Sequence, residues 1–167
     1  MAKRLIILAA LYFVIGFQIS LSAPFPGLAW DIDLVLIFLV ILSAKVGRGE
    51  AILWAALAGL ALDSFDIPAM GGQIVAKSSA IFILGLIIDS MNMEQPALLA
   101  GTIFILALLD RLIFRLFSPF AANFGWNFLR FDLPSAIITA LAGWILLMIA
   151  IRTGFFDPRA SEDHHGR

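Results

Sequence analysis

The chain is dominated by long apolar runs separated by short polar breaks, and this alternation constrains its fold more than any other feature. The runs extend from Leu5 to Leu21, Trp30 to Val46, Ala51 to Phe65, Ile67 to Ile88, Ala97 to Phe117 and Leu133 to Ile151. A helix needs about 20 apolar residues to cross a bilayer. A hydrophobic content of 62% with 14% charged residues lies outside the range of soluble domains. The sequence therefore predicts an all-α polytopic membrane bundle of six transmembrane helices and excludes a soluble enzyme.

The first three runs are open to a second interpretation. The uncharged cores of the second and third runs, 34–44 and 51–62, would each cover only about 18 Å as helix, against a hydrocarbon layer of about 30 Å. They span only if Asp33 and Asp63 lie at or inside the membrane boundary, and a re-entrant hairpin is the alternative. The first run could be a signal peptide. We predict an uncleaved span, because Pro24 would directly follow the weak cleavage pattern.

Basic residues are distributed unevenly between the two sides of a six-span arrangement. One side holds Lys3, Arg4, Lys45, Arg48, Arg152, Arg159 and Arg167, whereas the other holds at most Arg111, Arg115 and Arg130. An excess of Lys and Arg marks the cytoplasmic side, so both termini are predicted to lie in the cytoplasm. We expect residues 1–155 to form the membrane domain and residues 156–167 a polar, disordered cytoplasmic tail.

Composition removes several classes of function. The chain has no cysteine, which excludes disulfides, thiolate catalysis and cysteine-based metal sites. A net charge of -1 provides no basic field for nucleic acid. The two histidines, His164 and His165, are adjacent in the polar tail, which is a weak metal signal. No Ser–Lys or Ser–His arrangement occurs at a plausible depth, so we predict no enzyme, no cofactor and no metal site.

Five ionisable residues fall inside or close to the apolar runs, where an unpaired charge costs several kcal/mol. They are Asp63, Lys77, Asp110, Arg111 and Arg115. We predict an ion pair between Lys77 and either Asp110 or Asp63 that joins neighbouring helices. A polar site for a solute or partner, and a proton or ion path, are the alternatives. Arg111 and Arg115 share one helix face and are expected to extend to lipid head groups, with an acidic partner segment as the alternative.

Small residues mark two places in the middle of the chain. Ala55 and Gly59 form a small-xxx-small pair, which we assign to packing within the chain, with a dimer face as the alternative. Gly71 and Gly72 follow a proline and predict a broken or kinked start to the fourth span.

Between the last two runs lies an aromatic segment, residues 118–131, which contains Trp126. Aromatic rings prefer the membrane–water interface, so this segment is expected to lie in the outer interface. Docking of a partner is the alternative.

Asp31 to Leu36 opens the second apolar run, and Gly59 to Asp63 forms a glycine–aliphatic–aspartate stretch in the third. These two stretches resemble the opening of the second span and the close of the third in the MreD family of rod shape-determining membrane proteins. Gly71 falls where the family places a glycine after a short loop. Leu133 to Ala136 is similar to the proline–serine opening of its last span.

This resemblance implies a non-catalytic scaffold of the bacterial cell-wall elongation machinery in the inner membrane. Such a protein would bind a bitopic MreC-like partner and, through it, the MreB-type cytoskeleton and the peptidoglycan glycosyltransferase–transpeptidase pair, without a cofactor. Gly59, Asp63 and Gly71 match the family's motif. The aromatic segment and the last two spans are the expected docking surface.

A second family has a similar general architecture. Substrate-binding subunits of energy-coupling-factor vitamin transporters also have six spans, and polar groups such as Lys77, Gln73 and Asn92 would then hold a vitamin. These subunits usually carry an Ala-xxx-Ala docking pattern. Ala9, Ala10 and Gly16 of the first run do not have that spacing, so the scaffold is the preferred function.

Overall fold

The computed structural model describes residues 2–22, 32–65, 70–87, 96–117 and 124–152, and its regular structure within these ranges is entirely helical. The helices are α1 (Ala2–Ser22), α2 (Leu34–Ser43), α3 (Arg48–Asp63), α4 (Gly72–Ile87), α5 (Pro96–Phe117), the short α6 (Phe124–Asn127) and α7 (Leu133–Arg152). A π-helical turn, Phe128–Asp132, joins α6 to α7. The all-α prediction is confirmed, and each predicted apolar run corresponds to one of the six long helices. The predicted tail, 156–167, lies outside the described residues.

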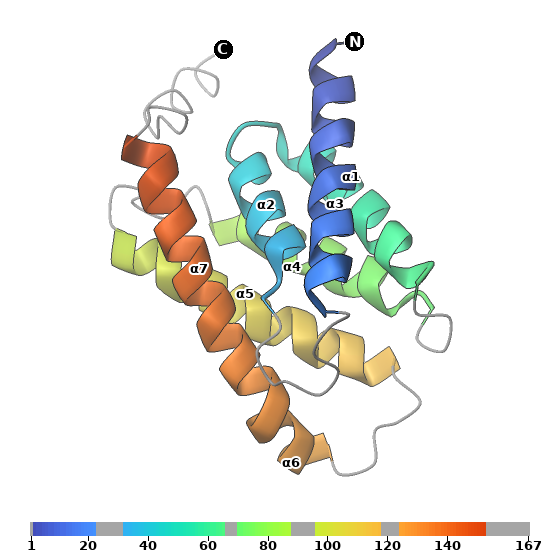
Figure 1. Ribbon diagram of the computed structural model, residues 1–167, viewed down its shortest axis with the longest axis vertical. Coiled ribbons are helices and arrows are strands. Elements are labelled where there is room, and N and C mark those ends of the chain that lie inside the picture. The colour runs from blue at the N-terminus through green and yellow to red at the C-terminus, as the bar shows by residue number, and fades with distance from the viewer. Residues whose placement is uncertain (1, 23–31, 66–69, 88–95, 118–123, 153–167) are drawn as a thin grey trace.

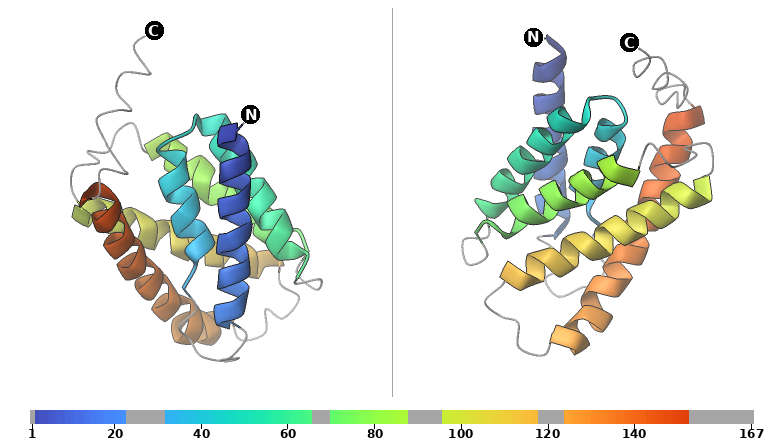
Figure 2. Two further views of the ribbon diagram at one scale, coloured as in Figure 1. Left: turned by 45° about the horizontal axis from the view of Figure 1, so that its top comes forward. Right: turned by 180° about the vertical axis from the view of Figure 1, so that it is seen from behind.

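The helices form two layers (Figures 1 and 2). Helices α3, α4 and α5 follow one another in the rear layer, and α1, α2 and α7 lie in front of it. The short α2 is central, because it contacts α1, α3, α4, α5 and α7. The start of α1, the turn between α2 and α3, and the end of α7 lie at the same end of the bundle. At that end the Arg4 guanidinium forms an ion pair with Glu50 at 3.2 Å, which joins α1 to α3.

Two helical stretches among the described residues are long and apolar enough to cross a membrane, Ala2–Leu21 and Phe128–Ile149. The apolar helices Leu34–Ser43 and Gly72–Ile87 are shorter. With 10 residues, α2 is about 15 Å long. It therefore covers about half of a hydrocarbon layer of about 30 Å.

Apolar side chains cover much of the surface of the bundle and also fill its interior. Val35, Leu36 and Ile37 of α2 are at most 1% exposed. On α1, in contrast, Tyr12 is 83% exposed and Phe13 is 73% exposed. Large exposed apolar surfaces are rare on soluble monomers and mark contact with a membrane or another protein.

Helices α3 and α4 pack closely because α3 carries small residues where they cross. Ala55 is fully buried, and a Cβ atom at Gly59 would lie 2.5 Å from the Ile74 Cα atom and 2.6 Å from the Gln73 carbonyl oxygen. No side chain fits in that space. The predicted role of this pair in packing within the chain is confirmed.

Two helices begin later than predicted, for local reasons. The second run was expected from Trp30, but α2 begins at Leu34 because Asp33 caps its first turn. The fourth was expected from Ile67, but α4 begins at Gly72. Gly71 has a φ of +93°, a left-handed conformation that glycine adopts without steric cost. The predicted break at Gly71 and Gly72 is therefore confirmed.

Candidate functional site

Lys77 is the centre of a buried ionic cluster. It lies on α4 and is 1% exposed. Its Nζ atom donates a hydrogen bond to Asp110 Oδ2 of α5 at 2.7 Å and another to Asp33 Oδ2, just before α2. Of the two partners predicted for Lys77, Asp110 is confirmed and Asp63 is wrong. The single ammonium group joins three helices at the middle of the bundle.

Asp33 has two roles in this cluster. Its Oδ1 atom accepts a hydrogen bond from the Leu36 backbone N–H at 2.8 Å, which caps α2, while its Oδ2 atom accepts from Lys77. Its own backbone N–H donates to Thr139 Oγ1 of α7 at 3.0 Å. Asp33 is 4% exposed. It therefore fixes the start of α2 inside the bundle, with α4 on one side and α7 on the other.

Asp110 is bonded less completely than Asp33. Its Oδ2 atom accepts from Lys77, but no donor among the described residues reaches its buried Oδ1 atom. The neighbouring Arg111 interacts electrostatically with both carboxylates. Its Nη2 atom donates to Ser135 Oγ of α7 at 2.7 Å. Two buried aspartates, one buried lysine and one half-buried arginine therefore meet at the junction of α2, α4, α5 and α7.

Asp63 anchors the first turn of α4. It is fully buried at the end of α3, and its two carboxylate oxygens accept hydrogen bonds from the backbone N–H groups of Gln73 at 3.0 Å and Ile74 at 3.1 Å. The first N–H groups of a helix have no partner within it, and a negative charge there is stabilising. Gly59 provides the close approach and Gly71 the turn that make this contact possible. These three residues form one structural unit, the α3–α4 corner.

Arg115 and Asp132 form a second buried contact between α5 and the start of α7. The Arg115 Nε atom donates to Asp132 Oδ2 within the π-helical turn, and the Asp132 side chain is 5% exposed. Arg111 reaches Ser135 one turn further along. Both arginines, which were expected to extend to lipid head groups, thus bond to partners within the chain that were not predicted. Both side chains find partners within the chain because the start of α7 lies across their shared face.

Trp126 lies at the end of the bundle on α6 and is 67% exposed. Next to it, the Arg130 guanidinium lies 5.5 Å from the centre of the Phe131 ring, a cation–π distance. The first part of the predicted aromatic segment, 118–123, is outside the described residues. Its second part is helical and presents an aromatic surface.

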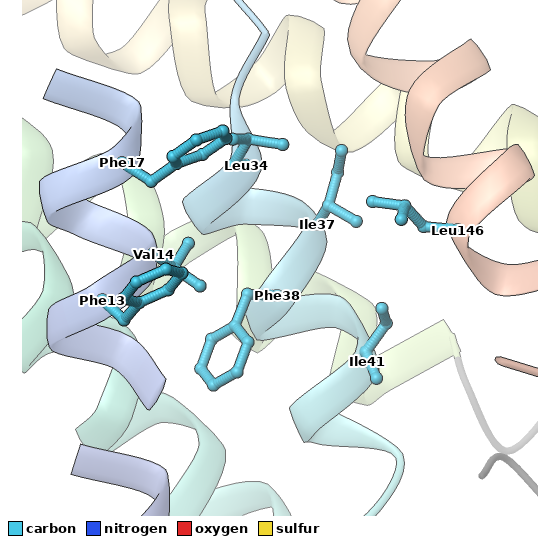
Figure 3. Close-up of a pocket in the computed structure, with 8 residues that line it drawn as sticks. All are labelled: Phe13, Val14, Phe17, Leu34, Ile37, Phe38, Ile41 and Leu146. Carbon is cyan, nitrogen blue, oxygen red and sulfur yellow. The ribbon is translucent and has the colours of Figure 1, made fainter. Parts of the chain in front are cut away.

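An apolar groove opens between α1, α2 and α7 (Figure 3). Its volume is about 250 Å³, which is below the range of about 300–1,000 Å³ typical of small-molecule sites. The floor is a stripe of α2 with helical spacing. The lining residues are Phe13, Val14, Phe17, Leu34, Ile37, Phe38, Ile41 and Leu146. All eight are hydrocarbon side chains, so the groove suits an apolar occupant.

The described residues contain no group of three or more histidine, aspartate or glutamate side chains able to hold a metal ion. Lys77, which the vitamin-transporter alternative places in a solute site, is bonded to two carboxylates instead. The polar centre therefore joins α4, α5, α7 and the start of α2 through side-chain hydrogen bonds.

Four residues of this centre could not be recognised as partners from the sequence: Asp33, Asp132, Ser135 and Thr139. Asp33 has the one usable signal, since an aspartate directly before an apolar run is a typical helix cap.

No protein family, curated protein or solved structure matches this chain.

Proposed function

We propose that the chain is a non-catalytic scaffold in the bacterial inner membrane that binds an MreC-type partner in the cell-wall elongation machinery. The observation that carries this proposal is that the buried charged side chains bond to other helices of the chain. Lys77, Asp33 and Asp63 are bonded to other parts of the chain and hold helices together. A solute-binding protein instead needs polar groups that converge on a pocket, whereas the groove in Figure 3 is apolar.

The proposed topology has six spans with both termini in the cytoplasm, and α2 accounts for only about half of the second crossing. It is supported by the start of α1 and the end of α7, which lie at the same end of the bundle. Lys3, Arg4, Lys45, Arg48 and Arg152 belong to elements that begin or end there. An excess of basic residues at one end agrees with a cytoplasmic side.

The residues that carry the resemblance to MreD proteins have a structural explanation in this chain. Gly59, Asp63 and Gly71 build the α3–α4 corner and are buried or engaged within it. Partner contact therefore belongs to outward surfaces. We assign it to the groove between α1, α2 and α7, because its walls are the two membrane-length helices, and to the exposed aromatic turn around Trp126.

Affinity purification in mild detergent, followed by mass spectrometry, tests the proposal. The tagged chain is expected to retain an MreC-like protein together with cell-wall synthases. Co-purification of a transmembrane coupling subunit with paired ATPases would instead identify a vitamin-transporter subunit.

Two neighbouring residues of α7 provide a matched pair of variants. Leu146 lines the groove and is 41% exposed, whereas Ile145 is 53% exposed and does not line it. Leu146→Trp fills the groove and is expected to reduce capture of the MreC-like protein. Ile145→Trp adds the same bulk beside the groove and is expected to leave capture unchanged. Equal capture by both variants would remove the groove from the proposed interface.

A further inference from the structure

The fully buried part of the ionic cluster contains one more negative than positive group. Lys77 is 1% exposed, Asp110 is 3% exposed and Asp33 is 4% exposed. Arg111 is only half-buried and bonds to Ser135, towards the edge of the cluster. Two carboxylates thus share a single ammonium group in a dry environment. Like charges that share a buried site cannot both remain ionised without a large cost.

The hydrogen bonds distinguish the two carboxylates. Both oxygens of Asp33 accept hydrogen bonds, one from the Leu36 N–H and one from Lys77. Asp110 accepts from Lys77 through Oδ2 only, and its buried Oδ1 atom meets no donor in the described part of the chain. Donors stabilise the ionised form of a carboxyl group. Asp33 is therefore the one held as a carboxylate.

We propose that Asp110 Oδ1 is a proton-binding site, so that the buried centre consists of a neutral Asp110 and an Asp33–Lys77 ion pair. A hydronium ion from solvent transfers its proton: one of its O–H bonds breaks, an O–H bond forms at Oδ1, and a water molecule is released. The bound proton cancels the excess negative charge of the three buried groups.

The surroundings of Asp110 are consistent with uptake of one proton. The charged groups that face it are Lys77 from α4, Asp33 before α2 and Arg111 on its own helix. From α7, Ser135 bonds Arg111 and Thr139 bonds the Asp33 backbone. The hydroxyl groups of Ser135 and Thr139 carry no charge. The balance at Asp110 is therefore set by one ammonium, one carboxylate and one half-buried guanidinium.

Infrared difference spectroscopy tests this site on the full chain in lipid. The spectrum is followed from about pH 4 to about pH 8, a range that includes the ordinary titration of exposed carboxyl groups at its acidic end. A buried acid is expected to give a protonated carboxyl band that persists at pH values above the titration of exposed carboxyl groups. The band should also shift slowly after transfer to deuterium oxide. The band should be absent from Asp110→Asn, which keeps the size of the side chain.

Two further variants make the assignment specific. Asp33→Asn keeps a residue able to cap α2 but leaves one carboxylate for one ammonium, so the acid band of Asp110 should weaken or disappear. Glu50→Gln removes an exposed carboxyl group at the α1–α3 contact and should leave the band unchanged.

The wild-type spectrum decides the proposal even if a variant fails to accumulate. A wild-type chain without a slowly exchanging acid band would overturn it, as would a band that survives in Asp110→Asn. The site does not depend on the proposed scaffold function, because capture of an MreC-like partner and proton uptake are measured separately.

Discussion

Replacing Gly59 by alanine tests whether the α3–α4 corner depends on close contact between two helix backbones. The added Cβ atom would lie 2.5 Å from the Ile74 Cα atom, whereas carbon atoms in contact are normally about 3.5–4.0 Å apart. The Ile74 Cα atom belongs to the helix backbone, so it cannot rotate away as a side-chain atom could. Helices α3 and α4 must therefore separate by about 1 Å or more.

The same movement would break the anchor of α4. The bonds from Gln73 and Ile74 to Asp63 are 3.0 and 3.1 Å long, so a further separation of about 1 Å takes them beyond hydrogen-bonding distance. Overpacking costs about 1–3 kcal/mol, and a hydrogen bond to a charged group contributes about 1.5–3 kcal/mol. We expect Gly59→Ala to lower the free energy of unfolding by about 3 kcal/mol or more.

Unfolding in detergent micelles by increasing sodium dodecyl sulfate, followed by helical circular dichroism, measures this loss. Gly101→Ala on α5 is the matched control, because Gly101 is exposed and an added Cβ atom there meets no other atom within 4 Å. The control should be neutral or slightly more stable. If the two variants differ by less than about 0.5 kcal/mol, the steric reasoning is refuted.

Three further predictions use the same unfolding measurement. Lys77→Met leaves the buried Asp33 carboxylate without its cation and Asp110 without its hydrogen-bond donor, and should cost about 3–5 kcal/mol. Adding Asp110→Leu should recover part of this loss. Asp63→Ala removes both acceptors at the start of α4 and should cost at least about 1.5–3 kcal/mol, whereas Asp63→Asn should cost less because one oxygen acceptor remains. Arg115→Leu leaves Asp132 buried without its partner and should cost about 1–3 kcal/mol.

Each of these expectations has an outcome that contradicts it. Additive losses for Lys77→Met and Asp110→Leu would show that the two residues do not interact. Equal losses for Asp63→Ala and Asp63→Asn would show that the single oxygen acceptor left in asparagine does not stabilise the start of α4. A stable Arg115→Leu variant would mean that Asp132 is satisfied without the guanidinium group.

The positions of the helices were predictable because hydropathy reports burial and lipid contact directly. Apolar runs and polar breaks locate all six long helices, and the errors at Trp30 and Ile67 are local. Asp33 delays the start of α2 to Leu34 by capping the helix, and Gly71, which adopts a positive φ, delays the start of α4 to Gly72. Hydropathy averages do not contain either effect.

The contacts of the polar centre were only partly predictable. Lys77 and Asp110 could be paired because each would be costly alone in an apolar layer. Asp33 and Asp132 were missed because they lie at the ends of apolar runs, where a carboxylate is expected to reach water. Ser135 and Thr139 have no sequence signal, since their roles depend on how α7 crosses α2 and α5. Crossing geometry comes from side-chain packing across the whole bundle.

The order of synthesis gives the central position of Asp33 a further significance. Its partner Lys77 is made 44 residues later, and Thr139, which accepts its backbone N–H, is made 106 residues later. In a chain that enters the membrane as it is made, α2 must wait for most of the protein before its polar start is satisfied. A ribosome that stops before α7 would therefore leave an intermediate in which the Asp33 backbone N–H lacks its Thr139 acceptor. Completion of the last helix is then the step that closes the bundle.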